Sequence, residues 1–180
     1  MPRFRPEDEI RLGIVLGYWE SSGKSDEWWT PPHVFEALGC RFDLDPACPA
    51  GGGDHVPTDN RISWGGLEAN WSGFIWLNPP FGGRNGIRPW LDRFAAHGNG
   101  IVLTPDRTSA PWFQEVVAEM DAVLFTPKLK FLRPDGSTGN SPSNGSCLMA
   151  IGWQGCAALE RGAGHGLGVL LHPTKRRAAP

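Results

Sequence analysis

Several patterns that commonly carry protein function are missing from this sequence. Its four cysteines form no Cys-x-x-Cys pair and its five histidines no His-x-x-x-His pair, so we expect free thiols and no metal site. No apolar run approaches about 18 residues and we recognise no signal peptide, so we expect a cytoplasmic protein without a membrane segment. The formal net charge of −2 gives no overall attraction to nucleic acid, which leaves any such contact to a local basic patch.

Tyrosine is nearly absent, whereas glycine, proline and tryptophan are abundant. The 180 residues suffice for one ordinary domain with a core and a central sheet. With 24 glycines and 17 prolines, we expect long loops and little helix. Nine tryptophans accompany a single tyrosine, and we expect some of them to face a ligand or a partner, although core packing alone can absorb most.

The most informative stretch is an apolar strand that ends in a proline turn. Four large apolar residues at 74–77 predict a buried strand, and the prolines at 79 and 80 end it because they lack a backbone N–H. The turn presents the Asn78 amide and the Pro79 carbonyl as hydrogen-bond acceptors beside the aromatic face of Phe81. Two acceptors and a stacking surface suit a flat ring that carries an amino group. A plain proline turn after a core strand explains these residues equally well.

Two segments upstream predict a ligand crevice. Thr30 is placed to cap a helix that has Pro31 at its first position and ends at Gly39. A short strand at 41–44 then ends in Asp45, followed by small residues and glycines, which is how open α/β sheets build a crevice. Asp59 can line the same crevice, but a solvated turn is at least as good an explanation for it.

The remaining elements predict an α/β fold. A short helix at 7–19 and a linker at 21–24 form an N-terminal arm (1–24), and residues 173–180 form a basic tail. Between them, in a domain at 25–172, a helix at 89–97, a strand at 101–105, a helix ending near 120 and a strand at 122–125 predict a mainly parallel sheet. Segments 128–133 and 147–153 are expected to form an antiparallel hairpin at its edge.

With these residues in view, the chain resembles the phage-type DNA N6-adenine methyltransferases, which use S-adenosylmethionine. The resemblance covers roughly residues 28–153 and depends on the shared order of the motifs more than on any one of them. The motifs are Trp-Trp-Thr-Pro-Pro (28–32), Phe-Asp-Leu-Asp-Pro-Ala (42–47), Thr-Asp-Asn (58–60), Asn-Trp (70–71), Trp-Leu-Asn-Pro-Pro-Phe (76–81), Thr-Pro-Asp-Arg-Thr-Ser-Ala-Pro-Trp-Phe (104–113) and Lys-Phe-Leu-Arg-Pro-Asp-Gly (130–136).

The resemblance implies a shortened, Rossmann-like class I methyltransferase fold with a doubly wound sheet. It implies a catalytic turn made of Asn78, Pro79, Pro80 and Phe81. It implies a cofactor pocket made of Trp29, Thr30, Pro31, Asp45, Pro46, Ala47 and, by position alone, Asp59 as the ribose-binding acid. The interval between Asp45 and Asn78 is short for this fold, which leaves the identity of that acid open.

The implied reaction transfers a methyl group to the N6 amino group of an adenine that has flipped out of DNA, in a bacterial cell and from a phage or prophage gene. The candidates for phosphate contact are Arg84, Arg88, Arg107, Lys130 and Arg133, although a solvated surface charge is an equally good reading of each. Another amino acceptor (cytosine N4, an RNA base or a glutamine side chain) and a non-catalytic nucleic-acid-binding module remain alternatives. The recognition sequence, the preference for single- or double-stranded DNA and the oligomeric state do not follow from the sequence.

Overall fold

The computed structural model describes residues 28–49, 55–81, 86–133, 135–139 and 144–174. The helix expected at 7–19, the linker at 21–24, Arg84 and the end of the basic tail lie outside these residues. The elements in the described part of the chain are α2 (Pro32–Leu38), β1 (Ile75–Leu77), α3 (Arg88–His97), β2 (Gly100–Pro105), α4 (Pro111–Val117), β3 (Ala122–Thr126), β4 (Ser146–Ile151), α5 (Trp153–Gly164) and β5 (Val169–Leu171). The expected α/β class is confirmed.

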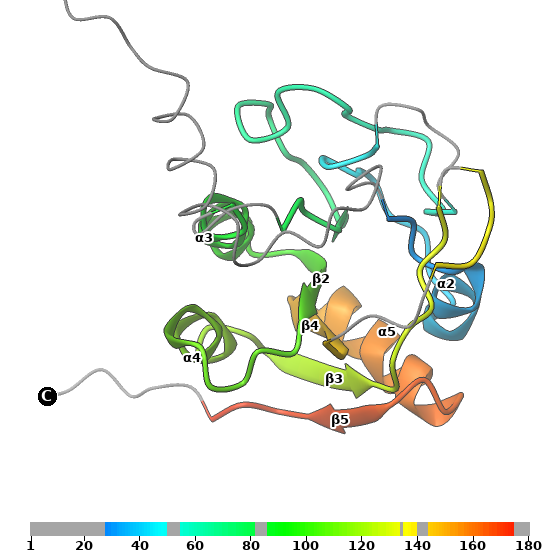
Figure 1. Cartoon of the computed structure of the whole chain (residues 1–180). Helices are drawn as coiled ribbons and strands as arrows, with labels where there is room; N and C mark the ends of the chain where they lie inside the picture. Colours follow the sequence, from blue (N-terminus) through cyan, green and yellow to red (C-terminus); the bar gives the residue numbers. More distant parts are fainter. Residues whose placement is uncertain (1–27, 50–54, 82–85, 134, 140–143, 175–180) are drawn as a thin grey trace, which may run out of the picture.

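The five strands form one sheet in the order β1-β2-β4-β3-β5 (Figure 1). β1 and β2 are parallel, β4 is antiparallel to both β2 and β3, and β5 is antiparallel to β3. β1, β2 and β3 therefore run in one direction, with β4 inserted between β2 and β3 in the opposite direction. The sheet is therefore mixed. The mainly parallel sheet that the sequence predicts is wrong, because three of the four strand pairs are antiparallel.

The expected antiparallel hairpin at the sheet edge is wrong. β4 lies inside the sheet, hydrogen-bonded on both sides, and its residues are buried from Ser146 to Ala150. The physical reason is that the backbone of β4 pairs with β2 on one side and β3 on the other, so no edge remains for a hairpin partner. The other half of the expected hairpin joins no strand of the sheet: Leu132 forms isolated bridges with Trp29 and Thr138 instead.

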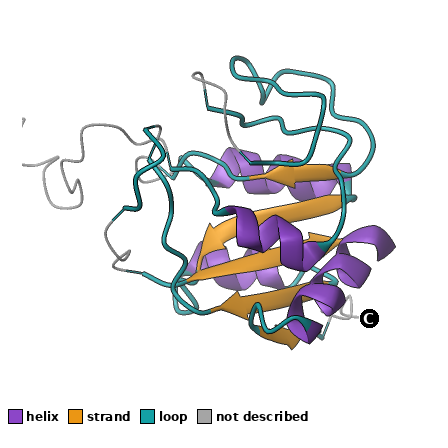
Figure 2. Cartoon of the chain, turned by 90° about the vertical axis from the view of Figure 1, so that its right-hand side faces the viewer, coloured by secondary structure: helices purple, strands orange, loops and turns teal. Residues whose placement is uncertain are grey.

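Helices cover both faces of the sheet (Figures 1 and 2). α2 and α5 pack on one face and α3 and α4 on the other, so there are two apolar clusters with the sheet between them. β1 contributes to both apolar clusters, because successive side chains of a strand point to opposite faces of the sheet. Trp76 joins the α2–α5 cluster, while Ile75 and Leu77 join the α3–α4 cluster.

The start of α2 corrects the expected cap. Pro31, not Thr30, is the N-cap residue, and its backbone is extended with ψ 145°. A residue that precedes a proline is disfavoured in the helical region, so the helix cannot begin before Pro32. Gly39 ends the helix as expected, at a φ of 57° that favours glycine. The Thr30 side chain therefore does not cap the helix.

The sequence reading missed α5 and β5. Glycines at 155, 162 and 164 lower the helix propensity of the α5 segment. Tertiary packing explains the first of them, because a Cβ at Gly155 would lie 2.8 Å from the Gly100 carbonyl oxygen. The glycine therefore lets α5 lie directly on β2. None of the helices in the described ranges is long and apolar enough to cross a membrane.

Candidate active site

A cavity of about 390 Å³ lies where two parallel segments of the sheet end. The first segment contains Leu44, which bridges Ile75 of β1, and the cavity begins at the next residue, Asp45. The second is β1 itself, which is followed by the Asn78–Phe81 turn. Crevices at the carboxyl ends of parallel strands are the usual ligand sites of open α/β sheets. The crevice predicted from the sequence is therefore present.

Four segments supply most of the cavity wall: Trp28–Thr30, Asp45–Pro49, Ile62–Gly66 and Asn78–Phe81. Val56, Trp76 and Trp90 complete it. The structure thus brings together Trp29, Thr30, Asp45, Pro46, Ala47 and the whole Asn78–Phe81 turn, which were selected from separate parts of the sequence.

The side-chain amide of Asn78 has a defined orientation. Its Nδ2 donates a hydrogen bond of 3.2 Å to the backbone carbonyl oxygen of Trp28. Oδ1 is then the atom that remains to accept a hydrogen bond, and no donor among the described residues binds it. The side chain is half-buried, while Phe81 is 41% exposed at the wall of the same cavity. The turn therefore presents an acceptor and an aromatic face together.

Asp45 is buried and held by backbone contacts. Its Oδ1 accepts a hydrogen bond of 3.0 Å from the N–H of Ala47, which closes the turn after the strand. Its own N–H donates to the Asn60 carbonyl and its carbonyl accepts from the N–H of Ile62, both at 2.9 Å. The segment at 60–62 therefore runs beside Asp45 and supports this wall of the cavity.

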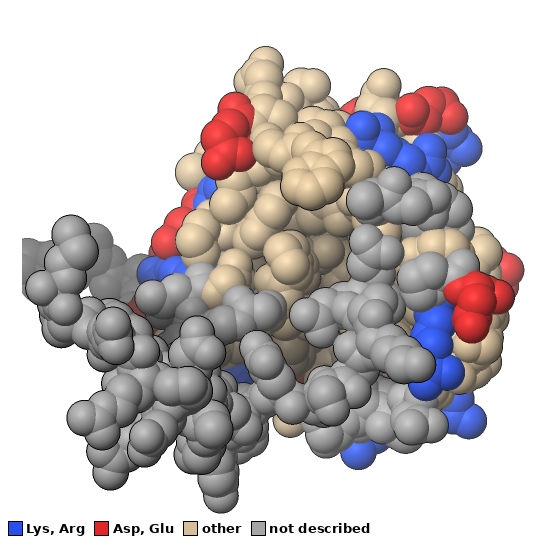
Figure 3. Space-filling view, turned by 45° about the horizontal axis from the view of Figure 1, so that its top comes forward, with Lys and Arg blue, Asp and Glu red and all other residues tan. Residues whose placement is uncertain are grey.

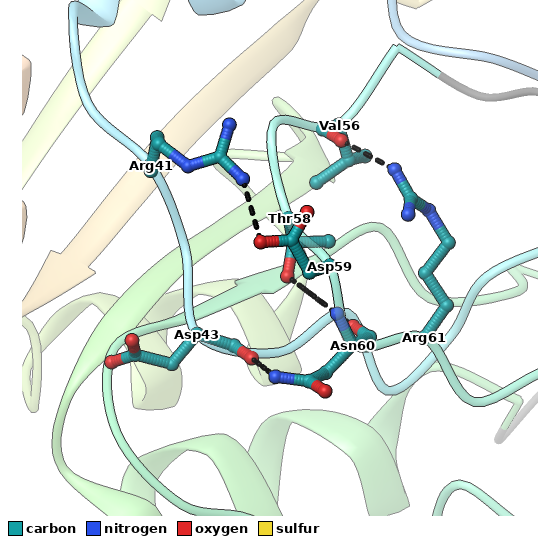
Figure 4. A network of polar contacts seen from close by, with 7 residues as sticks. All are labelled: Arg41, Asp43, Val56, Thr58, Asp59, Asn60 and Arg61. Carbon is teal, nitrogen blue, oxygen red and sulfur yellow. Dashed lines mark hydrogen bonds and ion pairs between the residues drawn. The ribbon is translucent and has the colours of Figure 1, made fainter.

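Polar contacts around Asn60 hold that segment in place (Figure 4). Asn60 donates from Nδ2 to the Asp43 carbonyl at 2.9 Å, and its N–H lies 3.3 Å from the Thr58 hydroxyl. Arg61 donates to the Val56 carbonyl at 2.8 Å. The Asn60–Asp43 bond joins the two segments in addition to the backbone bonds of the parallel bridge between Asp45 and Arg61, and the other two bonds brace the loop at 56–61.

Two of the predicted pocket residues do not line the cavity. The side chain of Asp59 is 89% exposed and forms an ion pair of 3.0 Å with Arg41 (Figure 4). Asp59 thus lies in a solvated turn, which was the alternative that the sequence allowed to a place in the crevice. Pro31 is buried as the N-cap of α2, next to Thr30 but not at the cavity surface.

Two polar atoms in the cavity wall are buried and have no hydrogen-bond partner among the residues that the structure describes: Trp29 Nε1 and Thr30 Oγ1. Thr30 is only 3% exposed. Buried polar groups are nearly always satisfied, so unsatisfied atoms on two consecutive residues of the wall are unusual. An indole N–H is a donor only, and a hydroxyl can also donate, so the pair suits an acceptor such as a carboxylate.

Trp64 lines the cavity and was not among the residues predicted from the sequence. Its side chain is 85% exposed although it lines the cavity. Large exposed aromatic residues beside a cavity are typical of binding surfaces. The available signal in the sequence was the unusual number of tryptophans in the chain. Ser63, just before it, also lines the cavity.

The described candidates for phosphate contact lie in different surroundings. Arg88 forms ion pairs with Asp92 and Glu115, so its charge already has partners. Arg107 is exposed at the surface after β2. Arg133 and Lys130 are exposed in a segment that contacts the cavity wall, since the Arg133 guanidinium lies over the Trp28 ring at 5.9 Å. Figure 3 shows uncharged surface in the middle of one side of the molecule, with side chains of both charges, Lys and Arg as well as Asp and Glu, toward its margins.

The comparison with protein families decides which group of proteins this site belongs to. A family model described as DNA N-6-adenine-methyltransferase (Dam) matches residues 20–161. The chain belongs to the Dam family. The match confirms the resemblance drawn from the motifs, and it contains every residue of the cavity wall. No curated protein and no solved structure matches the chain.

Membership of the Dam family implies DNA adenine methylation at the level of the family. The roles of single residues in this chain do not follow from the match and remain predictions. Among the described residues, no group of three or more His, Cys, Asp and Glu side chains is arranged to hold a metal ion.

Proposed function

We propose that the protein is an S-adenosylmethionine-dependent DNA methyltransferase that methylates the N6 amino group of adenine. The single observation that carries this is the Asn78 amide, held at the cavity with Nδ2 on the Trp28 carbonyl and Oδ1 left to accept. Family membership supplies the reaction class, and this amide supplies a place for an amino group.

The cavity residues fit the proposed cofactor. A volume of about 390 Å³ lies within the range of small-molecule sites. The orphan Trp29 Nε1 and Thr30 Oγ1 suit the carboxylate of its methionine part, and the Asp45 carboxylate supplies a negative charge for its cationic groups. We infer that Ser63 and Trp64 serve the nucleoside part, in place of the exposed Asp59. When bound, the cofactor supplies a methyl group that its sulfonium already activates.

The catalytic turn then needs to orient the acceptor. Asn78 Oδ1 and the Pro79 carbonyl would each accept one N–H of the adenine amino group, which stabilises the charge that develops on nitrogen during transfer. Phe81 would stack on the adenine ring. Because a paired base cannot reach this turn, the adenine must leave the duplex, which costs a few kcal/mol. No general base is assigned, since the proton released after transfer can pass to water.

DNA binding at the cavity needs basic side chains beside it for the phosphates. Lys130 and Arg133 are the best candidates for phosphate contact, because their segment contacts the cavity wall through Trp28. We further infer that the enzyme acts at a defined DNA sequence in the cytoplasm of a bacterial cell and that a phage or prophage encodes it, as in the proteins that its motifs resemble.

The test is transfer of a tritiated methyl group from S-adenosylmethionine to unmethylated DNA, to RNA and to total protein. We expect label in DNA, recovered as N6-methyladenine after digestion. Label recovered as N4-methylcytosine, or only in RNA or in glutamine side chains, would keep the chemistry and overturn the assignment of the acceptor. Cofactor binding without transfer to any of the three would favour the non-catalytic module.

A further inference from the structure

The Asn78 side chain has two nearly equal ways to lie. A rotation by about 180° about the last side-chain bond exchanges Oδ1 and Nδ2 with little change in shape. The Trp28 carbonyl is an acceptor, so it binds the NH₂ group and rejects the oxygen. This contact therefore selects the orientation in which Oδ1 is the acceptor, and its position depends on the backbone of Trp28.

The paired segments at 131–133 and 135–139 hold that backbone. Trp29 and Leu132 exchange two backbone hydrogen bonds of 2.9 Å as an antiparallel bridge. The two segments are joined to each other, because the N–H of Gly139 donates to the Phe131 carbonyl at 2.8 Å. The Trp28 ring thus lies against a small folded unit that belongs to no strand of the main sheet.

Gly139 is the tightest point of this unit. It is buried, and a Cβ built on it would lie 2.4 Å from Cζ3 of the Trp28 ring and 3.1 Å from the Phe131 carbonyl oxygen. Its φ is outside the left-handed region, so an alanine is acceptable to the backbone here and only space excludes it. Any side chain at 139 must push the Trp28 ring or the segment itself.

We propose that the segments at 131–133 and 135–139, through Gly139 and Trp28, are the positioning element of Asn78. It acts by holding the Trp28 carbonyl where it receives Nδ2, which keeps Oδ1 directed at the acceptor amino group. Gly139 and Trp28 are positioning residues, and neither needs to touch the adenine for this role. The inference rests on the proposed function, because it assumes that Asn78 Oδ1 binds the amino group.

The test compares Gly139→Ala with the wild type and with Gly164→Ala. Gly164 is the last residue of α5 and a Cβ there meets nothing within 4 Å, so it is the matched control for the same substitution in open space. The kcat for DNA methylation is expressed per cofactor-binding site, measured by calorimetry, so that unfolded protein does not count. We expect Gly139→Ala to lower kcat by roughly 100-fold, because a misplacement of about 1 Å at a reacting group has an effect of this order. The Kd for S-adenosylmethionine and the KM for DNA should stay close to the wild-type values.

A second pair of variants separates positioning from general damage. Trp28→Leu keeps the backbone carbonyl and removes the ring atom that the new Cβ would meet. In that background Gly139→Ala should lower kcat several-fold less than it does in the wild type. An equal loss of kcat in both backgrounds, or an unchanged kcat in Gly139→Ala alone, would overturn the positioning role of these segments. As long as the wild-type protein methylates DNA, neither outcome affects the proposed function. A wild-type protein that methylates no DNA overturns the proposed function and this inference with it.

Discussion

Replacing Asn78 by alanine tests the centre of the proposed mechanism. The change removes Oδ1, the acceptor that we assign to the adenine amino group, and also removes the 3.2 Å hydrogen bond from Nδ2 to the Trp28 carbonyl. Loss of one preorganised hydrogen-bonding group at a reacting centre typically lowers kcat by roughly 100- to 1,000-fold. Loss of the bond to Trp28 should lower the free energy of unfolding by only about 1 kcal/mol, because it joins two neutral groups.

The assay is single-turnover methylation of unmethylated DNA with saturating cofactor, accompanied by calorimetry of cofactor binding. We expect the Kd for S-adenosylmethionine to change little, because the residues fitted to the cofactor lie on other segments. Asn70→Ala is the control, since Asn70 is exposed and lies outside the cavity wall. Methylation by Asn78→Ala at the wild-type rate would refute the role of the turn. Loss of cofactor binding and activity together would show that the substitution damages the pocket instead.

Three further predictions follow from contacts of single residues. Trp64→Ala should weaken cofactor binding roughly 10-fold in calorimetry, because stacking on a base contributes about 1–3 kcal/mol. Trp153 is also exposed but lies outside this cavity, so Trp153→Ala should leave the Kd unchanged. Equal Kd values for the two variants would show that Trp64 does not contact the cofactor. Burial raises the pKa of the Cys147 thiol from 9.0 to about 12, so the native state holds this proton more tightly than the unfolded state does. The resulting contribution to the free energy of unfolding is complete below pH 9 and is lost as the pH rises from 9 to 12. Urea unfolding across that range should show a fall that is smaller in Cys147→Ala, and the same fall in both proteins would contradict the assignment. Gly155→Ala should destabilise the fold by about 1–3 kcal/mol, because its Cβ would lie 2.8 Å from a β2 carbonyl oxygen. Gly164→Ala should cost nothing in the same thermal unfolding assay, and a Gly155→Ala protein as stable as this control would show that α5 can move away from β2 freely.

Local signals predicted the parts of the site that depend on a few adjacent residues. Two prolines after four apolar residues end a strand wherever that strand lies, so the turn at 78–81 was readable without its surroundings. Asp45 followed by small residues marked the other strand end in the same way. The order of these motifs also indicated the family, which the family model confirms.

Other features depend on contacts between distant parts of the chain. The apolar run at 147–153 predicts a buried strand, but only its pairing with two distant segments decides that β4 lies between β2 and β3. The glycines of α5 are poor for an isolated helix, and a close approach to Gly100 makes one of them necessary. Short-range patterns contain neither piece of information.

The sequence alone determined the proline turn at 78–81 and the strand end at Asp45, because a few adjacent residues specify each of them. The order of the motifs along the chain determined the family. Only the tertiary structure decided that Thr30 and Trp29 carry unpartnered polar atoms in the cavity, that Asp59 turns away to Arg41, and that Trp28 orients the Asn78 amide. Each of these depends on which groups from distant segments come into contact, and local sequence patterns do not specify such contacts. The amide that carries the proposed reaction is thus recognisable from its tetrapeptide, and its orientation is set by a residue 50 positions away.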